Sequence, residues 1–234
     1  MQKIYQLIFF WWHWYWDYVY VGFWQVQGFI FRANFKKYVN GDDNKPAIIL
    51  LPGVYEKWQF MKPLADLFDH EGYRLHVIEA LGYNRGEIVE AAEYVENYIA
   101  KHNLRRYIIV AHSKGGLIGK YVMSQQKAAN CLGMVAVNTP FSGSIYAKYI
   151  PNRKLRMFSP VSKIILYLRG KKTVNSRIAS VYSKFDPHIP SGSYLEGGQN
   201  IQVPVYGHFK PLGNKRLQKI VLKEVERLSE GATS

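Results

Sequence analysis

YIIVAHSKGG, residues 107–116, is the stretch that indicates the fold of this chain. Its apolar and β-branched residues predict a buried strand, and a helix-forming segment, 117–129, follows at once. Ser113 lies between the two, with the small residues Ala111 and Gly115 two positions away on either side. Small side chains are needed there because the backbone doubles back on itself. This is the layout of a nucleophile elbow, in which a serine hydroxyl is exposed at the apex of a sharp strand-to-helix turn.

Short apolar strands alternate with helices of about 10 to 15 residues on both sides of this stretch. The predicted strands are 47–51, 73–81, the apolar run before Ser113, 132–137, 177–182 and 203–206. The predicted helices are 58–69, 87–102, 117–129 and a C-terminal helix over 217–228. Such alternation predicts a three-layer α/β architecture, with a mostly parallel central sheet covered by helices on both faces.

A polar connector, NGDDNKP at residues 40–46, divides the chain. Residues 1–45 are therefore expected to form an N-terminal aromatic segment with its linker, and residues 46–234 the α/β domain. Within that domain the basic stretch 145–176 breaks the alternation of strands and helices. It is interpreted as a small insertion that lies over the edge of the sheet where the carboxyl ends of the strands meet.

The insertion contains one predicted helix, 161–168, with Ser159 placed to cap it and Pro160 in its first turn. The apolar residues of this helix fall on one face, and Lys and Arg flank them. The insertion is expected either to cap a pocket or to dock on lipid. A plain crossover helix is the simpler alternative.

The composition excludes some kinds of site. The single cysteine, Cys131, excludes an internal disulfide and a cysteine-based metal site, and its apolar context favours a buried thiol. The net charge of +14 is concentrated in one region, because thirteen Lys or Arg and no Asp or Glu lie between Lys114 and Lys184. Such a region is either a solvated basic face or a surface attracted to a polyanion, which would be anionic lipid or nucleic acid.

The N-terminal segment favours lipid. Residues 9–24 contain eleven aromatic side chains, among them five of the six tryptophans of the protein. Trp and Tyr suit the boundary between lipid headgroups and acyl chains. Asp17 and His13 interrupt the segment, which disfavours a membrane span, and no signal-peptide cleavage site is apparent. We therefore expect an aromatic helix lying flat on a bilayer, and a peripheral membrane or cytoplasmic location. Packing of this helix on the domain or on a partner chain is the alternative.

A serine at such a turn needs a base, and the base needs an acid to orient it. No carboxylate occurs between Ser113 and Asp186, which lies just past one predicted strand, and His208 lies just past the last one. Parallel sheets gather functional groups at this edge, so Ser113, Asp186 and His208 are expected to meet there. Glu196 and His188 are weaker candidates because no strand positions them. His112 is expected to point away from Ser113 and to serve packing or a supporting contact.

Acyl-transfer chemistry also needs donors for an oxyanion. One candidate is the backbone N–H of Lys114, the residue after the serine. The other is the N–H of Val54, which Gly53 allows to turn toward the site after the first strand. A phosphate-binding loop is disfavoured at this junction, because neither a G-x-G-x-x-G nor a GK[ST] pattern is present.

Taken together, these motifs resemble those of the α/β-hydrolase superfamily, and within it the small lipase/esterase branch. The motifs are LPGV (51–54), AHSKGG (111–116), NTPFSGS (138–144), SKFDPHIP (183–190) and YGHF (206–209). NTPFSGS is similar to the TPxxGS stretch that follows the next strand in many lipases. The match covers roughly residues 47–230. Its departures are Ala111 in place of glycine and Pro52 in place of histidine.

The resemblance implies Ser113 as nucleophile, Asp186 as acid and His208 as base. It also implies Val54 and Lys114 as backbone oxyanion donors, with no metal or organic cofactor. The expected function is hydrolysis of lipid-like carboxylic esters through an acyl-enzyme, by a protein in peripheral contact with anionic membrane. Thioesterase, amidase or acyltransferase chemistry would use the same residues. A non-catalytic lipid- or protein-binding scaffold is the alternative from another class, and nucleic acid is not an expected partner because no binding motif for it is present.

Overall fold

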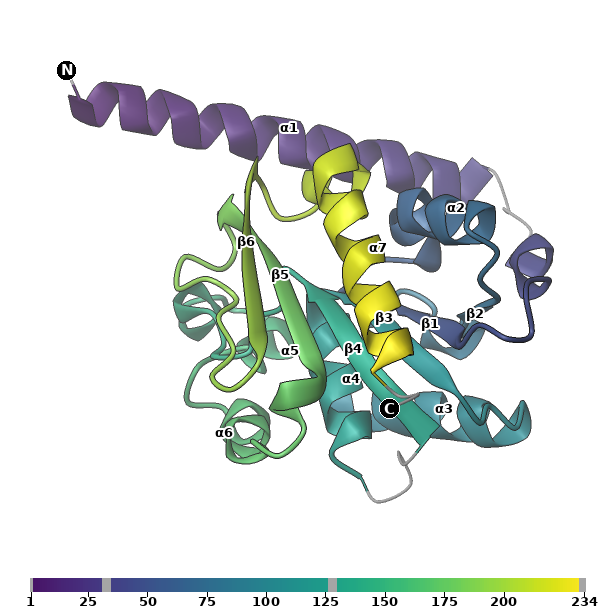
Figure 1. The fold of residues 1–234 in the computed structure, drawn as a ribbon. Coiled ribbons are helices and arrows are strands. Elements are labelled where there is room, and N and C mark those ends of the chain that lie inside the picture. Colours follow the sequence, from purple (N-terminus) through teal and green to yellow (C-terminus); the bar gives the residue numbers. More distant parts are fainter. Residues whose placement is uncertain (1, 31–34, 126–129, 232–234) are drawn as a thin grey trace.

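The computed structural model describes residues 2–30, 35–125 and 130–231. Six strands form one sheet in the order β2-β1-β3-β4-β5-β6, and every pair of neighbours is parallel (Figure 1). The strands are β1 (Ala47–Leu51), β2 (Leu75–Val77), β3 (Tyr107–His112), β4 (Cys131–Val137), β5 (Ile178–Phe185) and β6 (Gln199–Tyr206). Because all six run the same way, their carboxyl ends meet at a single edge.

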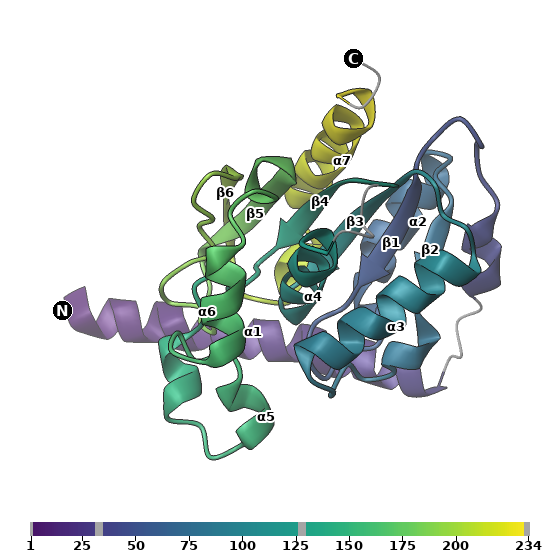
Figure 2. The ribbon, with the colours of Figure 1, turned by 90° about the horizontal axis from the view of Figure 1, so that it is seen from below.

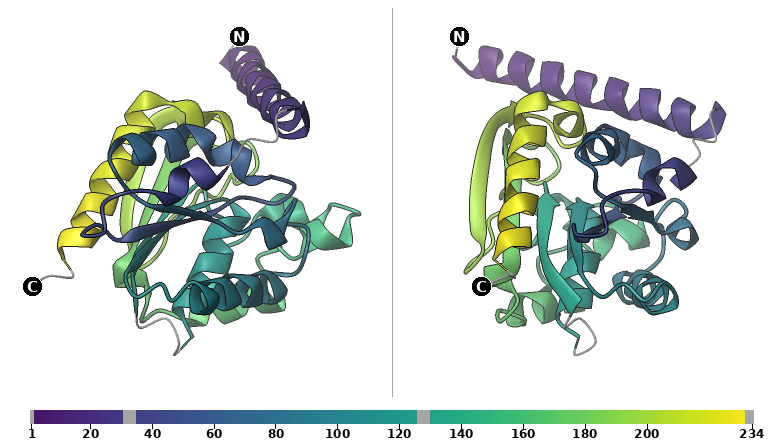
Figure 3. Two further views of the ribbon diagram at one scale, coloured as in Figure 1. Left: turned by 90° about the vertical axis from the view of Figure 1, so that its right-hand side faces the viewer. Right: turned by 45° about the vertical axis from the view of Figure 1, so that its right-hand side comes forward.

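Helices cover both faces of the sheet (Figures 2 and 3). One face packs against α3 (Ile88–Lys101), α4 (Lys114–Met123) and α6 (Lys163–Gly170). The other face packs against α2 (Lys62–His70) and α7 (Lys215–Glu230). Alternate residues of a central strand point to opposite sides, so that Ile109 lies in one core and Ile108 in the other. The predicted three-layer architecture is confirmed.

Several elements differ from their predicted bounds. The strand predicted over 73–81 is only three residues long, because β2 is an edge strand that pairs with β1 alone and the chain then turns into a 3-10 helix, Glu79–Leu81. The helix predicted from residue 58 begins with a 3-10 turn, Trp58–Met61, and α2 follows with a proline in its first turn. The predicted helix 117–129 corresponds to α4, which begins earlier, at Lys114. Residues 126–129 of the predicted helix lie outside the described ranges.

The cap of the helix in the basic insertion was also wrongly predicted. The helix, α6, begins at Lys163, and Ser162 caps it, accepting a hydrogen bond from the N–H of Ile165 at 3.4 Å. Ser159 and Pro160 belong to the preceding turn, because the N–H of Ser162 already donates to the Ser159 carbonyl at 2.9 Å. A short helix, α5 (Arg153–Arg156), precedes this turn.

The N-terminal aromatic segment forms one helix, α1 (Gln2–Ile30), which lies across the end of the molecule where the carboxyl ends of the strands meet (Figures 1 and 3). Its inner side contacts the rest of the chain along much of its length. Phe9 packs edge-on against Tyr206 at 5.1 Å between ring centroids, and the Gln25 amide donates to the Tyr55 carbonyl at 2.9 Å. The alternative prediction, packing on the domain, therefore describes this side of the helix.

The opposite side of α1 is exposed, and we call it the outer face. Its residues recur at three- and four-residue spacing and are Ile4, Ile8, Trp11, Trp12, Tyr15, Val19, Phe23 and Val26. No helix in the described ranges is both long enough and apolar enough to cross a membrane.

Candidate active site

Ser113 stands at the turn between β3 and α4, with φ 51° and ψ −118°. Such a φ is strained for a residue other than glycine, and the surroundings hold it in place. The N–H of Ser113 donates to the Val137 carbonyl at 2.9 Å. Gly115 must lack a side chain, because a Cβ there would lie 2.0 Å from the Leu51 carbonyl oxygen. The expected strand–turn–helix arrangement is present.

The structure brings His208 and Asp186 to this serine. His208 follows β6, and its Nε2 lies 2.9 Å from the Ser113 Oγ. Asp186 follows β5, and its Oδ2 lies 2.7 Å from the His208 Nδ1. The Asp186 Oδ1 accepts the N–H groups of His188 at 2.8 Å and Ile189 at 3.1 Å, which fix the carboxylate.

This arrangement selects a tautomer. The Asp186 carboxylate accepts a hydrogen bond from His208 Nδ1–H, which leaves a lone pair on Nε2 for the serine hydroxyl. Burial by itself lowers the pKa of His208, but the carboxylates around it, Asp186 first, outweigh burial and raise that pKa above its ordinary value. The imidazolium form that would arise on taking the serine proton is therefore stabilised.

The weaker candidates lie elsewhere or have a different role. The Glu196 side chain is 74% exposed and pairs with Lys172 at 3.0 Å, remote from any buried base. His188 lies beside the site, with its ring 5.1 Å from that of His208, but its buried Nε2 has no hydrogen-bond partner among the described residues. Burial, together with the nearby His208, lowers the pKa of His188 to about 4.

The loop after β1 carries the first of the two predicted oxyanion donors. Val54 lines the same cavity as Ser113, and its N–H donates no hydrogen bond within the described part of the chain. The preceding residue is fixed, because the N–H of Gly53 donates to the Glu56 carboxylate at 2.7 Å. The second predicted donor, Lys114, is the first residue of α4, where a backbone N–H has no partner within the helix.

The Lys114 side chain has a role that the sequence does not reveal. It is fully buried, and its ammonium group donates to the carbonyl of Asn84 at 2.9 Å, the side-chain oxygen of Asn84 at 3.0 Å and the carbonyl of Gly86 at 2.6 Å. Asn84 in turn donates to the Pro52 carbonyl at 2.7 Å. The side chain of one candidate donor thus anchors the loop that carries the other.

His112, the last residue of β3 and the neighbour of Ser113, takes part in a second buried network. Its Nδ1 lies 2.8 Å from the Glu56 carboxylate, and its Nε2–H donates to the His208 carbonyl at 3.0 Å. His112 and Glu56 are both buried. The supporting contact expected for His112 is therefore present, and Glu56 is a residue that the sequence argument missed.

A third missed residue comes from the N-terminal helix. Asp17 is buried, and its carboxylate accepts three successive backbone N–H groups from the loop that carries His208. The distances are 2.8 Å from Oδ2 to the N–H of His208 and 2.8 Å from Oδ1 to those of Phe209 and Lys210. Asp17 therefore does not interrupt a lipid-facing surface, because it points inward.

A mainly apolar cavity of about 150 Å³ opens beside Ser113 and His208. The predicted insertion provides part of its wall through Tyr146, Ala147, Ile150, Leu155 and Phe158. Its helix α6 instead packs on the sheet through Ile165 and Leu168, as a plain crossover helix does. Residues 146–158 of the insertion thus contribute to a pocket, as one alternative expected, whereas α6 is a crossover helix, as the other expected.

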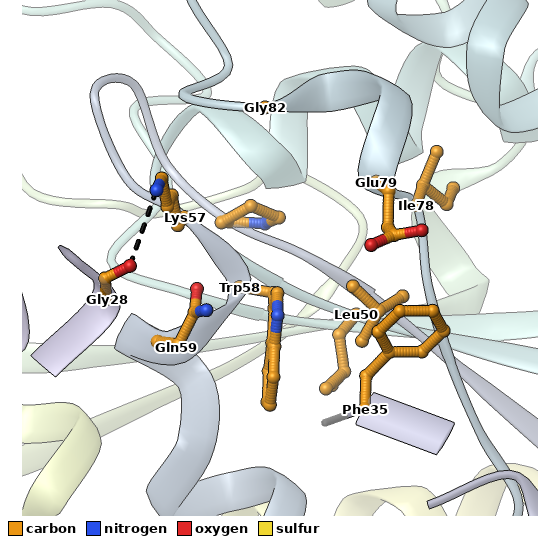
Figure 4. Close-up of a pocket in the computed structure, with 11 residues that line it drawn as sticks. Gly28, Phe35, Leu50, Lys57, Trp58, Gln59, Ile78, Glu79 and Gly82 are labelled. Atoms are coloured by element: carbon orange, nitrogen blue, oxygen red, sulfur yellow. Dashed lines mark hydrogen bonds between the residues drawn. The ribbon is translucent and has the colours of Figure 1, made fainter. Parts of the chain in front are cut away.

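A second cavity, of about 270 Å³, lies under the C-terminal end of α1 (Figure 4). Trp58, Leu50 and Phe35 line it, and at its rim the Lys57 ammonium donates to the Gly28 carbonyl at 3.4 Å. It is lined by neither the serine, the acid nor the histidine described above, so it is not the candidate active site.

Comparison with known proteins agrees with this architecture. Residues 46–159 match a family model described as the alpha/beta hydrolase fold. No curated protein sequence is significantly similar to this chain.

Solved structures of hydrolases superpose on most of the chain. A lipase from Bacillus licheniformis is 14% identical, with 79% of this chain and 94% of that chain covered and a TM-score of 0.62. A monoacylglycerol lipase from Paleococcus ferrophilus is 12% identical, with coverage of 78% and 96% and a TM-score of 0.55. A carboxylesterase from Nitrososphaera gargenis is 10% identical, with coverage of 82% and 94% and a TM-score of 0.57. At these identities the likeness is one of fold.

Proposed function

We propose that this chain, an α/β hydrolase by fold, is a serine hydrolase that cleaves carboxylic esters through an acyl-enzyme. The observation that carries the proposal is the hydrogen-bonded series Ser113–His208–Asp186 at a strained strand-to-helix turn. We assign Ser113 as nucleophile, His208 as general base and Asp186 as the acid that orients it. Residues 46–234 would form the catalytic domain, with a small cap from 145–176, and residues 1–45 an N-terminal element.

In the first step, the His208 Nε2 takes the proton of the Ser113 hydroxyl as Oγ attacks the ester carbonyl. The oxyanion formed on the carbonyl oxygen accepts hydrogen bonds from the backbone N–H groups of Val54 and Lys114. The tetrahedral intermediate collapses when the imidazolium gives its proton to the leaving alkoxide. An alcohol departs, and the acyl group stays on Ser113 as an ester.

In the second step, water takes the place of the alcohol. His208 removes a proton from water as the water attacks the acyl-enzyme, and then returns it to the Ser113 oxygen, which releases a carboxylic acid. Asp186 remains ionised throughout and stabilises the imidazolium in both steps. No other group has to change its protonation state.

The cavity beside Ser113 favours an apolar acyl group. Its walls are mainly Val54, Leu155, Phe158 and Ile189, and its volume of about 150 Å³ suits a short or medium acyl chain. A lipid-like ester fits this lining. Thioester hydrolysis or acyl transfer would use the same residues, and the assays below separate these reactions.

We also propose that the outer face of α1 contacts an anionic membrane. It is a row of aromatic and aliphatic side chains, Trp11, Trp12 and Tyr15 among them, and the chain carries a net charge of +14. Aromatic side chains bind the interfacial zone of a bilayer, and positive charge is attracted to anionic headgroups. The protein would then be peripheral to the membrane.

The test of the catalytic proposal is intact-mass analysis after exposure to a fluorophosphonate probe. Wild-type protein is expected to gain one adduct and Ser113→Ala none. Turnover of a short-chain p-nitrophenyl ester should fall by several orders of magnitude in that variant. An adduct of equal yield on both proteins, or equal turnover, would refute Ser113 as nucleophile. Matched ester and thioester series, with and without an added alcohol as acyl acceptor, then identify the reaction.

The test of the membrane proposal is co-sedimentation of the full chain with vesicles. Vesicles of phosphatidylcholine with phosphatidylglycerol should retain the wild type, and the triple variant Trp11→Ser, Trp12→Ser, Tyr15→Ser should stay in the supernatant. The matched control is Tyr194→Ser, an exposed aromatic outside α1. Equal retention of the triple variant and the wild type contradicts the proposal.

A further inference from the structure

The only acidic residue of the 29-residue helix α1 is buried. A carboxylate removed from water is costly unless hydrogen bonds replace its hydration. Here the replacements all come from one place, the backbone of residues 208–210, which lies more than 190 positions away in the sequence. On the helix, Asp17 is on the side opposite the outer face.

The loop is built to receive this carboxylate. Three successive N–H groups converge on Asp17, an arrangement that binds anions in many proteins. Gly207, just before the loop, has φ 114°, and a Cβ there would lie 2.6 Å from the Asp17 Oδ1. A glycine is therefore needed at this position both for the backbone conformation and for the approach of the carboxylate.

The backbone of His208 is held from two sides. Its carbonyl accepts hydrogen bonds from the side chains of Asn138 at 2.9 Å and His112 at 3.0 Å. His112 is the last residue of β3, and Asn138 directly follows β4. Its N–H donates to Asp17, and among the described residues no other group accepts it. Loss of the Asp17 carboxylate would thus free the N–H side of the backbone while the carbonyl side stayed anchored.

We propose that α1 is a positioning element of the active site, and that Asp17 is the positioning residue that holds the loop of the general base. The proposal rests on the function proposed above for His208. The structure supports it in that the carboxylate holds the backbone of the base itself and of the two residues after it.

The charges around His208 also support a positioning role for Asp17. The charge of Asp17, after that of Asp186, contributes to raising the pKa of His208. Burial raises the pKa of Asp17 itself, and the hydrogen bonds from the loop offset this rise only in part, so that the pKa stays above its ordinary value. The other titratable groups that face His208 are Glu56, His112 and His188, and those that face Asp17 are His13, Tyr18, Tyr20 and Lys210.

The experiment uses Asp17→Asn in the full chain, which keeps the size of the side chain and removes its charge. The rate of fluorophosphonate labelling and kcat for a short-chain ester should fall by about 10²-fold, the loss typical of a misplaced catalytic group, with KM little changed. The acid limb of the profile of kcat/KM against pH should move to lower pH, because His208 loses a negative neighbour. A merely structural defect would lower the rate without moving that limb.

The matched control is Gly22→Ala on the same helix, where an added Cβ meets nothing within 4 Å. This variant should label at the wild-type rate. Gly207→Ala approaches the same contact from the loop side and should slow labelling as Asp17→Asn does.

A second readout does not depend on activity. Amide hydrogen exchange at residues 208–210 should be at least about tenfold faster in Asp17→Asn than in the wild type, with α7 unchanged. Wild-type labelling kinetics, or wild-type exchange at these amides, in a folded Asp17→Asn protein would overturn the proposal. Failure of the proposed function looks different, because Ser113→Ala would then label as the wild type does.

Discussion

Two buried lysines allow a matched test of how charge burial acts on this fold. Lys114 and Lys120 are both buried in α4, and desolvation lowers the pKa of each from 10.5 to about 8. They differ in their partners. Lys114 donates three hydrogen bonds, whereas the Lys120 ammonium donates none to the described residues and lies 5.8 Å from the centroid of the Phe141 ring. The substitutions to compare are Lys114→Met and Lys120→Met.

The sign of the pH dependence follows from the direction of the shift. Between the two pKa values the unfolded chain binds a proton that the folded chain does not bind, so the folded protein gains stability as pH rises from about 8 toward 10.5. At about 1.4 kcal/mol per pKa unit, each lysine costs the folded state about 3 kcal/mol below pH 8. Either substitution removes both that cost and its pH dependence. The free energy of unfolding of each variant, relative to that of the wild type, should therefore fall by about 2–3 kcal/mol between about pH 7 and pH 10.

The two variants should differ in the part of the stability change that does not depend on pH. Lys120→Met removes a buried charge for which the described residues offer no hydrogen-bond acceptor, so it should stabilise the protein near pH 7 by up to about 3 kcal/mol. Lys114→Met leaves two buried acceptors on Asn84 and a partly buried one on Gly86 without this donor, each at about 1–3 kcal/mol, which outweighs the relief of burial. It should therefore destabilise the protein at both pH values.

Urea unfolding followed by tryptophan fluorescence, at about pH 7 and about pH 10, measures these differences. All other titrating groups are common to the three proteins and cancel in the comparison. A difference between wild type and variant that does not change with pH would refute the lowered pKa of that lysine. Stabilisation by Lys114→Met near pH 7 would show that its hydrogen bonds are worth less than the cost of burying its charge.

Three further outcomes are expected. Glu56→Gln removes one partner of a buried pair with His112 and should cost about 3 kcal/mol, which for a chain of this size lowers Tm by about 6–12 °C in calorimetry. Asp186→Asn should lower kcat by about 10⁴-fold and move the acid limb of kcat/KM to lower pH, because His208 then loses the carboxylate that raises its pKa; an unmoved limb would contradict this assignment. Phe158→Ala enlarges the cavity beside the serine, so the ratio of kcat/KM for an octanoyl ester to that for a butyryl ester should rise, while a ratio that falls would place the acyl group elsewhere.

The residues that the sequence identifies are those with a local signal. Ser113 is flanked by small residues between a strand and a helix, and Asp186 and His208 each follow a strand. Because parallel strands end at one edge, these local positions suffice to predict that the three side chains meet. The stretch without carboxylates before Asp186 leaves a single choice of acid with a strand before it.

The residues that the sequence misses depend on contacts between distant segments. Nothing around Asp17 in an aromatic helix indicates that its partners are residues 208–210, and the motifs that resemble those of α/β hydrolases do not include this helix. Glu56 and the side chain of Lys114 likewise acquire their roles only when distant segments pack together, Glu56 against His112 of β3 and Lys114 of α4 against the loop at Asn84. The short β2 depends on its pairing with β1 alone, which the alternation of apolar residues does not specify. The cap at Ser162 depends on the local turn before α6, in which the Ser162 hydroxyl also donates to the Met157 carbonyl.

The contact between Asp17 and residues 208–210 forms late during protein synthesis, because its two sides are far apart in the sequence. Asp17 leaves the ribosome before its hydrogen-bond donors, which follow 191 to 193 residues later. At translation rates of about 5–20 residues per second, this separation is roughly 10–40 s. Throughout that interval the aromatic helix has no loop to dock on, and its inner side is as exposed as its outer face. A nascent chain with such an exposed apolar helix is open to binding by chaperones or to contact with a lipid surface before His208 is in place.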